Sequence, residues 1–90
     1  MKVLRQSLYF ESLEAIEDYI AQDNPSAAVD LWLTIDDHVS KLADPNFPRR
    51  RGRIEGTLEL VAHPNYIVVL RQTLETVTAI EVLHSAMKYP

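Results

Sequence analysis

The sequence predicts a single α+β domain with the element order β-α-α-β-β-β, in which an N-terminal helical hairpin packs on one face of an antiparallel sheet. Three observations support this fold class. Apolar residues recur three and four positions apart between residues 7 and 42, which is the period of an amphipathic helix. The period changes to two after residue 56, where Val, Ile, Leu, Thr and Tyr predominate. The chain has 90 residues, of which 47% are hydrophobic. Residues 1–90 can therefore form one hydrophobic core but are too few to form two.

The first half of the chain reads as a short strand followed by a helix. Residues 2–6 form the opening strand, and the helical period begins at Ser7. Leu13, Ile16 and Ile20 fall on one stripe, with acidic residues between them. This spacing predicts an amphipathic helix that buries one side.

A second helix follows after a very short joint. Asn24 is a suitable N-cap and Pro25 suits the first helical position. Pro45 and Pro48 end the helix, because proline cannot continue the hydrogen-bond ladder. Two amphipathic helices with so short a connection form an antiparallel hairpin. The apolar stripe of the second helix consists of Ala28, Leu31, Trp32, Ile35, Val39 and Leu42.

The second half of the chain predicts an antiparallel meander. Residues 49–56 form a basic segment, which we expect to be a loop with a short extended piece. His63-Pro64 and Thr73-Leu74-Glu75 are the expected turns. One face of a meander is usually packed, and the helical hairpin would cover it. The three expected strands are Thr57–Ala62, Asn65–Arg71 and Thr76–His84.

The composition excludes several classes of protein. Without cysteine there is no disulfide framework, no thiolate nucleophile and no sulfur-ligated zinc. No apolar run approaches the roughly 20 residues of a membrane span. The N-terminus lacks the apolar stretch of a signal peptide. The three histidines lack the spacing of metal ligands. We therefore expect a cytoplasmic protein that binds no metal, no cofactor and no membrane.

The charge is distributed unevenly. The formal net charge of −4 argues against a protein that coats nucleic acid non-specifically. Residues 1–44 carry −6, however, and residues 45–90 carry +2. Guanidinium groups pair with phosphates and carboxylates, so an arginine run suits an acidic protein as well as a nucleic acid. A solvated loop is the alternative, but we favour a docking surface formed by Arg49, Arg50, Arg51 and Arg53.

Histidines and paired carboxylates are the other candidates for chemistry. Asp36 and Asp37 lie on the expected polar side of the second helix, where charged residues are ordinary. His38 lies beside them and is expected at the surface. His63 falls in a turn, where it caps the turn or contacts solvent. His84 ends the last strand and is the best placed for acid–base or hydrogen-bonding work. The residues alone nevertheless favour a partly exposed strand-end histidine without such a role.

Four stretches of the chain carry recognisable motifs, namely Asp18–Pro25, Gly56–Val61, His63–Arg71 and Val82–Pro90. The last three follow, with substitutions, the patterns G-T-R-E-L-V, P-N-Y-I-V-x-Y-R and R-V-L-H-x-x-x-x-x-P. Together with the helical hairpin, they resemble the RelE/ParE superfamily of toxins from bacterial type II toxin–antitoxin modules. The resemblance covers nearly the whole chain and is strongest over residues 56–90.

The resemblance implies one of two activities. RelE-like members cut messenger RNA on the ribosome, whereas ParE-like members poison DNA gyrase without known hydrolytic chemistry. In the nuclease pattern, arginines occupy the positions of Leu58 and Glu81, and a tyrosine occupies that of Leu70. These replacements favour the ParE-like branch and a protein that is not an enzyme. If the chain were an RNase, its remaining catalytic residues would be His84, Arg53 and Arg71.

The resemblance also implies partners. A ParD-like or similar antitoxin would form a hetero-oligomer with this chain, with a helix along the apolar hairpin and an extended portion against the sheet. A third alternative is a degenerate toxin that binds only its antitoxin, because arginines at positions 58 and 81 are common in ParE-like toxins too. The expected antitoxin-binding residues are Leu13, Ile20, Trp32 and Ile35. The expected contacts to gyrase are Arg51, Arg53, His84 and Lys88.

Overall fold

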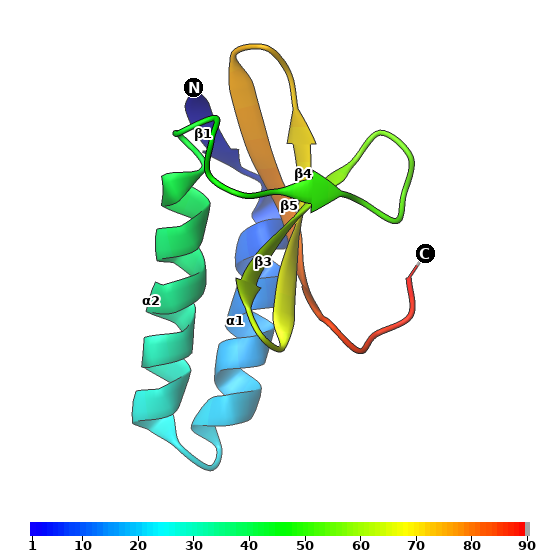
Figure 1. The fold of residues 1–90 in the computed structure, drawn as a ribbon. Coiled ribbons are helices and arrows are strands. Elements are labelled where there is room, and N and C mark those ends of the chain that lie inside the picture. Colours follow the sequence, from blue (N-terminus) through cyan, green and yellow to red (C-terminus); the bar gives the residue numbers. More distant parts are fainter. Residues whose placement is uncertain (90) are drawn as a thin grey trace.

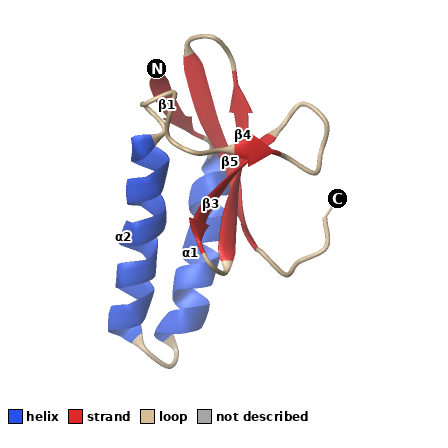
Figure 2. Ribbon diagram, viewed as in Figure 1, coloured by secondary structure: helices blue, strands red, loops and turns tan. Residues whose placement is uncertain are grey.

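The structure is a computed structural model that describes residues 1–89. Pro90, the last residue of the motif at 82–90, lies outside the described residues. Two helices lie side by side against one face of a five-stranded sheet (Figures 1 and 2). The predicted α+β class and the helical hairpin are confirmed. In chain order the elements are β1 (Lys2–Arg5), α1 (Ser7–Ala21), α2 (Pro25–Lys41), β2 (Arg50–Arg51), β3 (Leu58–His63), β4 (Tyr66–Gln72) and β5 (Thr76–His84).

The joint between the helices forms as its sequence predicts. The side chain of Asn24 accepts a hydrogen bond from the backbone N–H of Ala27 at 3.1 Å, and Pro25 occupies the first helical position. The cap satisfies one of the free N–H groups at the start of α2, and proline there leaves no N–H to satisfy. The helices therefore reverse direction within a few residues and stay in contact along their length.

The sheet differs from the prediction in two respects, since the extended piece Arg50–Arg51 adds a fifth strand, β2, and one strand pairing is parallel. Its strand order is β1-β5-β4-β3-β2, and β3, β4 and β5 form the expected antiparallel meander. However, β1 pairs with β5 in parallel, from Lys2 opposite Thr76 to Arg5 opposite Ala79. The sheet is therefore mixed, and the expectation of a purely antiparallel sheet was wrong. Parallel pairing needs a long crossover, and the helices together with the meander supply it.

The core lies between the helices and one face of the sheet. Tyr9, Leu13 and Ile35 from the helices pack against Leu60 and Val68 from the strands. Because side chains alternate along a strand, the neighbours of these strand residues point to the other side of the sheet, which we call the far face.

The far face is also partly buried. Glu59, Ile67 and Val69 are all buried there, although no helix covers them. The loop 52–57 and the tail, which we define as residues 85–89, extend on this side of the sheet (Figure 1).

A β-bulge in β5 changes the alternation. Val69 is opposite Glu81 and Leu70 is opposite Ala79, so Ile80 has no partner in β4. The extra residue lets Ala79 and Val82, three positions apart, both point into the core.

Asp36 and Asp37 were both expected on the polar side of the second helix, and this expectation is wrong for Asp36. Asp37 is exposed and pairs with Lys41 one turn later. Asp36 instead lies half-buried between three elements. Its Oδ1 accepts hydrogen bonds from Arg5 Nε at 2.9 Å and from the Tyr9 hydroxyl at 2.7 Å. Asp36 therefore joins β1, α1 and α2, because its helix position turns it toward β1 rather than toward solvent.

The loop before β3 needs glycine at position 52. A Cβ atom there would lie 2.2 Å from Thr57 Oγ1 and 2.9 Å from the Thr57 carbonyl oxygen. The Thr57 hydroxyl is held by a hydrogen bond to the Ile54 carbonyl, so it cannot move away freely. We expect Gly52→Ala to lower the free energy of unfolding by about 1–3 kcal/mol. Denaturant melts measure this, with exposed Glu55→Ala as the control; equal midpoints for the two variants would contradict it.

Candidate functional site

The arginine run does not form one free docking surface. The Arg49 side chain turns back to the end of α2, where it donates to the carbonyl oxygens of Phe47 at 3.0 Å, Asp44 at 2.6 Å and Leu42 at 3.3 Å. It also donates to the side chain of Gln72 at 3.0 Å. These contacts close the connection between α2 and β2. Arg49 is therefore structural, in contrast to its expected role.

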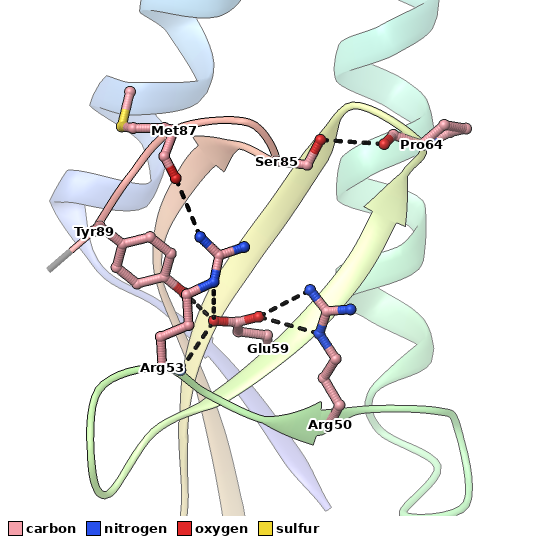
Figure 3. A network of polar contacts seen from close by, with 7 residues as sticks. All are labelled: Arg50, Arg53, Glu59, Pro64, Ser85, Met87 and Tyr89. Atoms are coloured by element: carbon pink, nitrogen blue, oxygen red, sulfur yellow. Dashed lines mark hydrogen bonds and ion pairs between the residues drawn. The ribbon is translucent and has the colours of Figure 1, made fainter.

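Two further arginines converge on a buried carboxylate, Glu59 (Figure 3). Glu59 is only 1% exposed and lies on the far face. Its Oε1 accepts from Arg50 Nε at 3.1 Å, and its Oε2 accepts from the backbone N–H of Arg53 at 3.1 Å. The Arg53 Nε lies 3.7 Å from the same Oε2, and the Tyr89 hydroxyl donates to it as well. We call Glu59, Arg50, Arg53 and Tyr89 the Glu59 cluster.

The cluster keeps Glu59 ionised despite its burial. Burial alone would raise the pKa of the Glu59 carboxyl. Hydrogen bonds from Tyr89, the Arg53 backbone and Arg50, together with the Arg50 charge, outweigh burial and leave the pKa below its usual range. The reverse holds for the phenol, since burial and the hydrogen bond to Glu59 raise the pKa of Tyr89 to about 12. At neutral pH the tyrosine is therefore the donor and the carboxylate the acceptor.

This lowered pKa predicts a dependence of stability on pH. Glu59 contributes stability above the usual pKa of a carboxyl group, and this contribution is lost as the pH falls through its lower folded-state pKa. We expect Glu59→Gln to lower the melting temperature at neutral pH and to reduce the additional loss on acidification. Glu55→Gln removes the same charge from an exposed site in the preceding loop and should melt like wild type. An equal fall in the melting temperatures of wild type and Glu59→Gln on acidification would contradict the expectation.

The start of the tail is organised by His84. Its Nδ1 accepts from the backbone N–H of Ala86 at 3.0 Å, and its carbonyl oxygen accepts from the N–H of Met87 at 2.9 Å. The N–H of Ser85 donates to the carbonyl of Asn65 at 2.8 Å. The chain therefore turns immediately after β5 and crosses toward the far face.

The end of the tail is held by Arg53. The Nη1 of Arg53 donates to the Met87 carbonyl at 3.1 Å, and its guanidinium carbon lies 4.8 Å from the centre of the Tyr89 ring (Figure 3). This distance is within the range of cation–π attraction. Lys88 lies between these two held residues and is exposed. Arg53 therefore contacts the residues on both sides of Lys88.

The histidines take separate places. His84 lines a hollow of about 290 Å³ with Ala15, Ile16 and Tyr19 of α1, so its ring lies on the helix side of the sheet. His63 accepts the backbone N–H of Asn65 at 3.1 Å and so caps its turn, as expected.

His38 was expected at the surface, but it is half-buried. Its Nδ1 donates to the Thr34 carbonyl at 2.8 Å, and its ring lies edge-on to Phe47. The connection after α2 folds over it, which the helical pattern alone does not reveal.

The three residues expected for an RNase are not gathered in one site. Arg53 belongs to the Glu59 cluster, and Arg71 has the strand parity of Val69, which places it on the far face. His84 faces α1 on the opposite side of the sheet.

The replaced positions Leu58 and Glu81 are also on different faces. Leu58 packs against the core, whereas Glu81 is in register with Val69, which is itself opposite Glu59. The far face therefore carries two carboxylates in one row across three strands.

The expected gyrase contacts are divided in a similar way. Arg53 contacts the two neighbours of Lys88, and His84 forms the base of the tail. Arg51 lies apart in a hollow of about 420 Å³, which is also lined by Leu58, Gln72 and Thr73.

The expected antitoxin residues are only partly accessible. Leu13 and Ile35 are buried in the core, so neither side chain is exposed to a partner in this structure. Their stripe positions point directly at the sheet, which leaves no surface for a partner. Ile20 and Trp32 are half-buried. The exposed apolar residues on the hairpin are instead Leu8, Phe10, Tyr19, Val29 and Leu33.

Glu59 and Tyr89 were missed as members of a site. A signal for Glu59 was present, because a glutamate flanked by leucines in an apolar strand must have partners if it is buried. The four arginines upstream were the available counter-ions. No local sequence pattern connects Tyr89 to Glu59, since the contact between them spans 30 positions.

Within residues 1–89, no helix is long and apolar enough to cross a membrane. In the same part of the chain, no three acidic or histidine side chains are grouped as metal ligands would be.

Comparison with known proteins finds a matching family and a solved structure of similar fold. Residues 8–89 match the family described as "ParE toxin of type II toxin-antitoxin system, parDE". The fold is similar to a chain in the solved structure titled "Chromosomal ParDE TA system from P. aeruginosa", with a TM-score of 0.82 and 17% sequence identity. The alignment covers 93% of this chain and 95% of that chain. A search of curated protein sequences finds no match.

Proposed function

Because the chain belongs to the ParE toxin family of type II toxin–antitoxin systems, we propose that it inhibits DNA gyrase and is neutralised by direct binding of a cognate antitoxin. The match over residues 8–89 is the observation that carries this proposal. The protein acts by binding rather than by hydrolysis. Gyrase works on DNA in the bacterial cytoplasm, so the proposal also assigns the protein to that compartment.

The far face supports binding rather than RNA cleavage. Cleavage at a ribose 2′-hydroxyl needs a base, an acid and cations around one phosphate. Here Arg53 is engaged by Glu59 and the tail, and His84 lies on the other side of the sheet. The far face, with Lys88 and the exposed part of Arg53, is suited to a protein surface with acidic groups.

The antitoxin surface is proposed on the outer side of the hairpin. Val29 and Leu33 lie one turn apart on α2 and are exposed, with Trp32 beside them. An amphipathic helix docks on such i, i+4 anchors by burying its own apolar side. A toxin–antitoxin hetero-oligomer would cover these side chains.

A supercoiling assay tests the proposed target. Purified protein is expected to block supercoiling by gyrase and to increase the amount of cleaved DNA complex. Lys88→Ala should weaken inhibition by about tenfold, as loss of one charged contact does. Lys41→Ala removes an exposed lysine on α2 and should inhibit like wild type. Wild-type protein without effect at high concentration would refute the gyrase proposal.

Two outcomes would assign a different function. Transcript cuts that require ribosomes and disappear in His84→Ala would indicate an RNase. If expression of the protein harms no cell, although the protein still binds its antitoxin, it is a degenerate toxin. A DNA-damage response in cells that express the protein without its antitoxin would support gyrase as the target.

A further inference from the structure

The end of the tail, at residues 87 and 89, is attached to the far face through contacts that lead back to one carboxylate. Tyr89 donates to Glu59 directly, and Arg53, which pairs with Glu59, holds the Met87 carbonyl and lies over the Tyr89 ring. We propose that Glu59 is a positioning residue that fastens the tail to the far face and so fixes Lys88 beside Arg53. The consequence for a target rests on the proposed gyrase function, whereas the positioning itself does not.

Glu59 is the central member because Arg50, Arg53 and Tyr89 all contact it. It is 1% exposed, whereas the side chains of Arg50 and Arg53 are 54% and 37% exposed. A buried carboxylate must keep its partners, but half-exposed arginines can turn to water. Without the negative charge, Arg50 and Arg53 would also repel each other. Loss of Glu59 therefore releases Arg53 and Tyr89 together, and the tail loses both of its attachments at residues 87 and 89.

The attachment determines where Lys88 is presented. Met87 is fixed through its carbonyl and Tyr89 through its hydroxyl, so the backbone of Lys88 is fixed on both sides. The Lys88 side chain itself is exposed. A free tail would still carry the charge, but binding would then have to order it, which lowers affinity. Glu59 thus contributes to a cationic surface although it is itself an anion.

The experiment compares tail mobility in matched variants. Glu59→Gln removes the charge and Tyr89→Phe removes only the hydroxyl. Glu55→Gln and Tyr19→Phe make the same chemical changes at exposed positions. Amide hydrogen exchange is measured at residues 85–87, whose N–H groups are hydrogen-bonded, with β3 and β4 as an internal reference. Loss of a hydrogen bond to a charged group should accelerate exchange of the tail by about 10- to 100-fold.

A spectroscopic readout separates positioning from general loosening. The phenol of Tyr89 titrates with a pKa of about 12 in wild type, and in Glu59→Gln it should move toward the ordinary value of about 10. Carbon-13 labelled tyrosine reports this, and Tyr89→Phe identifies the resonance. The double variant should exchange no faster than the faster single variant, because both changes break one link.

The outcomes decide the proposal independently of the target. Exchange that accelerates more in the tail than in β3 and β4, in both variants, supports it. Unchanged exchange in Glu59→Gln, or equal acceleration throughout β3 and β4, overturns it. In the supercoiling assay, a freed tail with undiminished inhibition overturns the role in target binding. Wild-type protein that does not inhibit gyrase refutes only the proposed target, since the exchange data still decide whether Glu59 positions the tail.

Discussion

Replacing Asp36 with alanine is expected to lower the free energy of unfolding by about 2–4 kcal/mol. The variant loses the ion pair with Arg5 and removes the acceptor of the Tyr9 hydroxyl, which is 0% exposed. Burial, followed by the hydrogen bond to Asp36, raises the pKa of Tyr9, so the phenol remains a donor that needs an acceptor. For a domain of this size, the loss corresponds to a melting temperature lower by about 10–20 °C.

The adjacent residue supplies the control. Asp37→Ala removes the same side chain from the same helix, but breaks only an exposed pair with Lys41. Its cost should stay within about 0.5 kcal/mol. Asp36→Asn keeps an acceptor for Tyr9 and should recover part of the loss. Thermal melts at neutral pH that fail to separate Asp36→Ala from Asp37→Ala would show that the contacts among β1, α1 and α2 contribute little.

The fold was predictable wherever a local pattern carries the information. The cap at Asn24 with Pro25 determines the joint between the helices, and it formed as expected. The period of two after residue 56 predicted the meander, although β3 continues one residue further, through His63. These features depend on neighbours within a few positions. They can therefore be read from the sequence.

Features that depend on distant pairing were not predictable in the same way. The parallel pairing of β1 with β5 joins residues more than 70 positions apart. The bulge at Ile80 produces no recognisable sequence pattern in an apolar strand. The assignment of Asp36 failed for a related reason, because its partner Arg5 belongs to another element. A helical pattern assigns a side of the helix but not what lies opposite it.

The candidate site shows the same limit. The arginine run was identified from the sequence, but its interpretation as one surface assumed that all four side chains are free. Arg49 returns to the end of α2, and Arg50 and Arg53 are held by Glu59. Charge counts do not distinguish a cation that faces solvent from one that neutralises a buried acid. For this reason the acidic total said less about function than the position of one glutamate.

The second large effect concerns the apolar stripe of α2. Ile35 is 0% exposed and packs between the helices and the sheet, so Ile35→Ala leaves a cavity in the core. We expect a loss of about 2–5 kcal/mol in the free energy of unfolding, measured by denaturant melts. This is a large part of the roughly 5–13 kcal/mol available to a domain of 90 residues. Binding of the antitoxin by the folded fraction should remain close to wild type.

Leu33→Ala, two positions away, should behave in the opposite manner. Leu33 is 57% exposed, so its truncation should change stability by less than about 0.5 kcal/mol. If the antitoxin docks on the outer side of the hairpin, the same truncation should weaken binding by about 1–2 kcal/mol, or roughly 5- to 30-fold. Calorimetric titration with the antitoxin measures the binding, and melts of the free protein measure stability. A Leu33→Ala variant with unchanged affinity would place the antitoxin elsewhere. Strong loss of affinity in folded Ile35→Ala would mean that the hairpin must open to receive it.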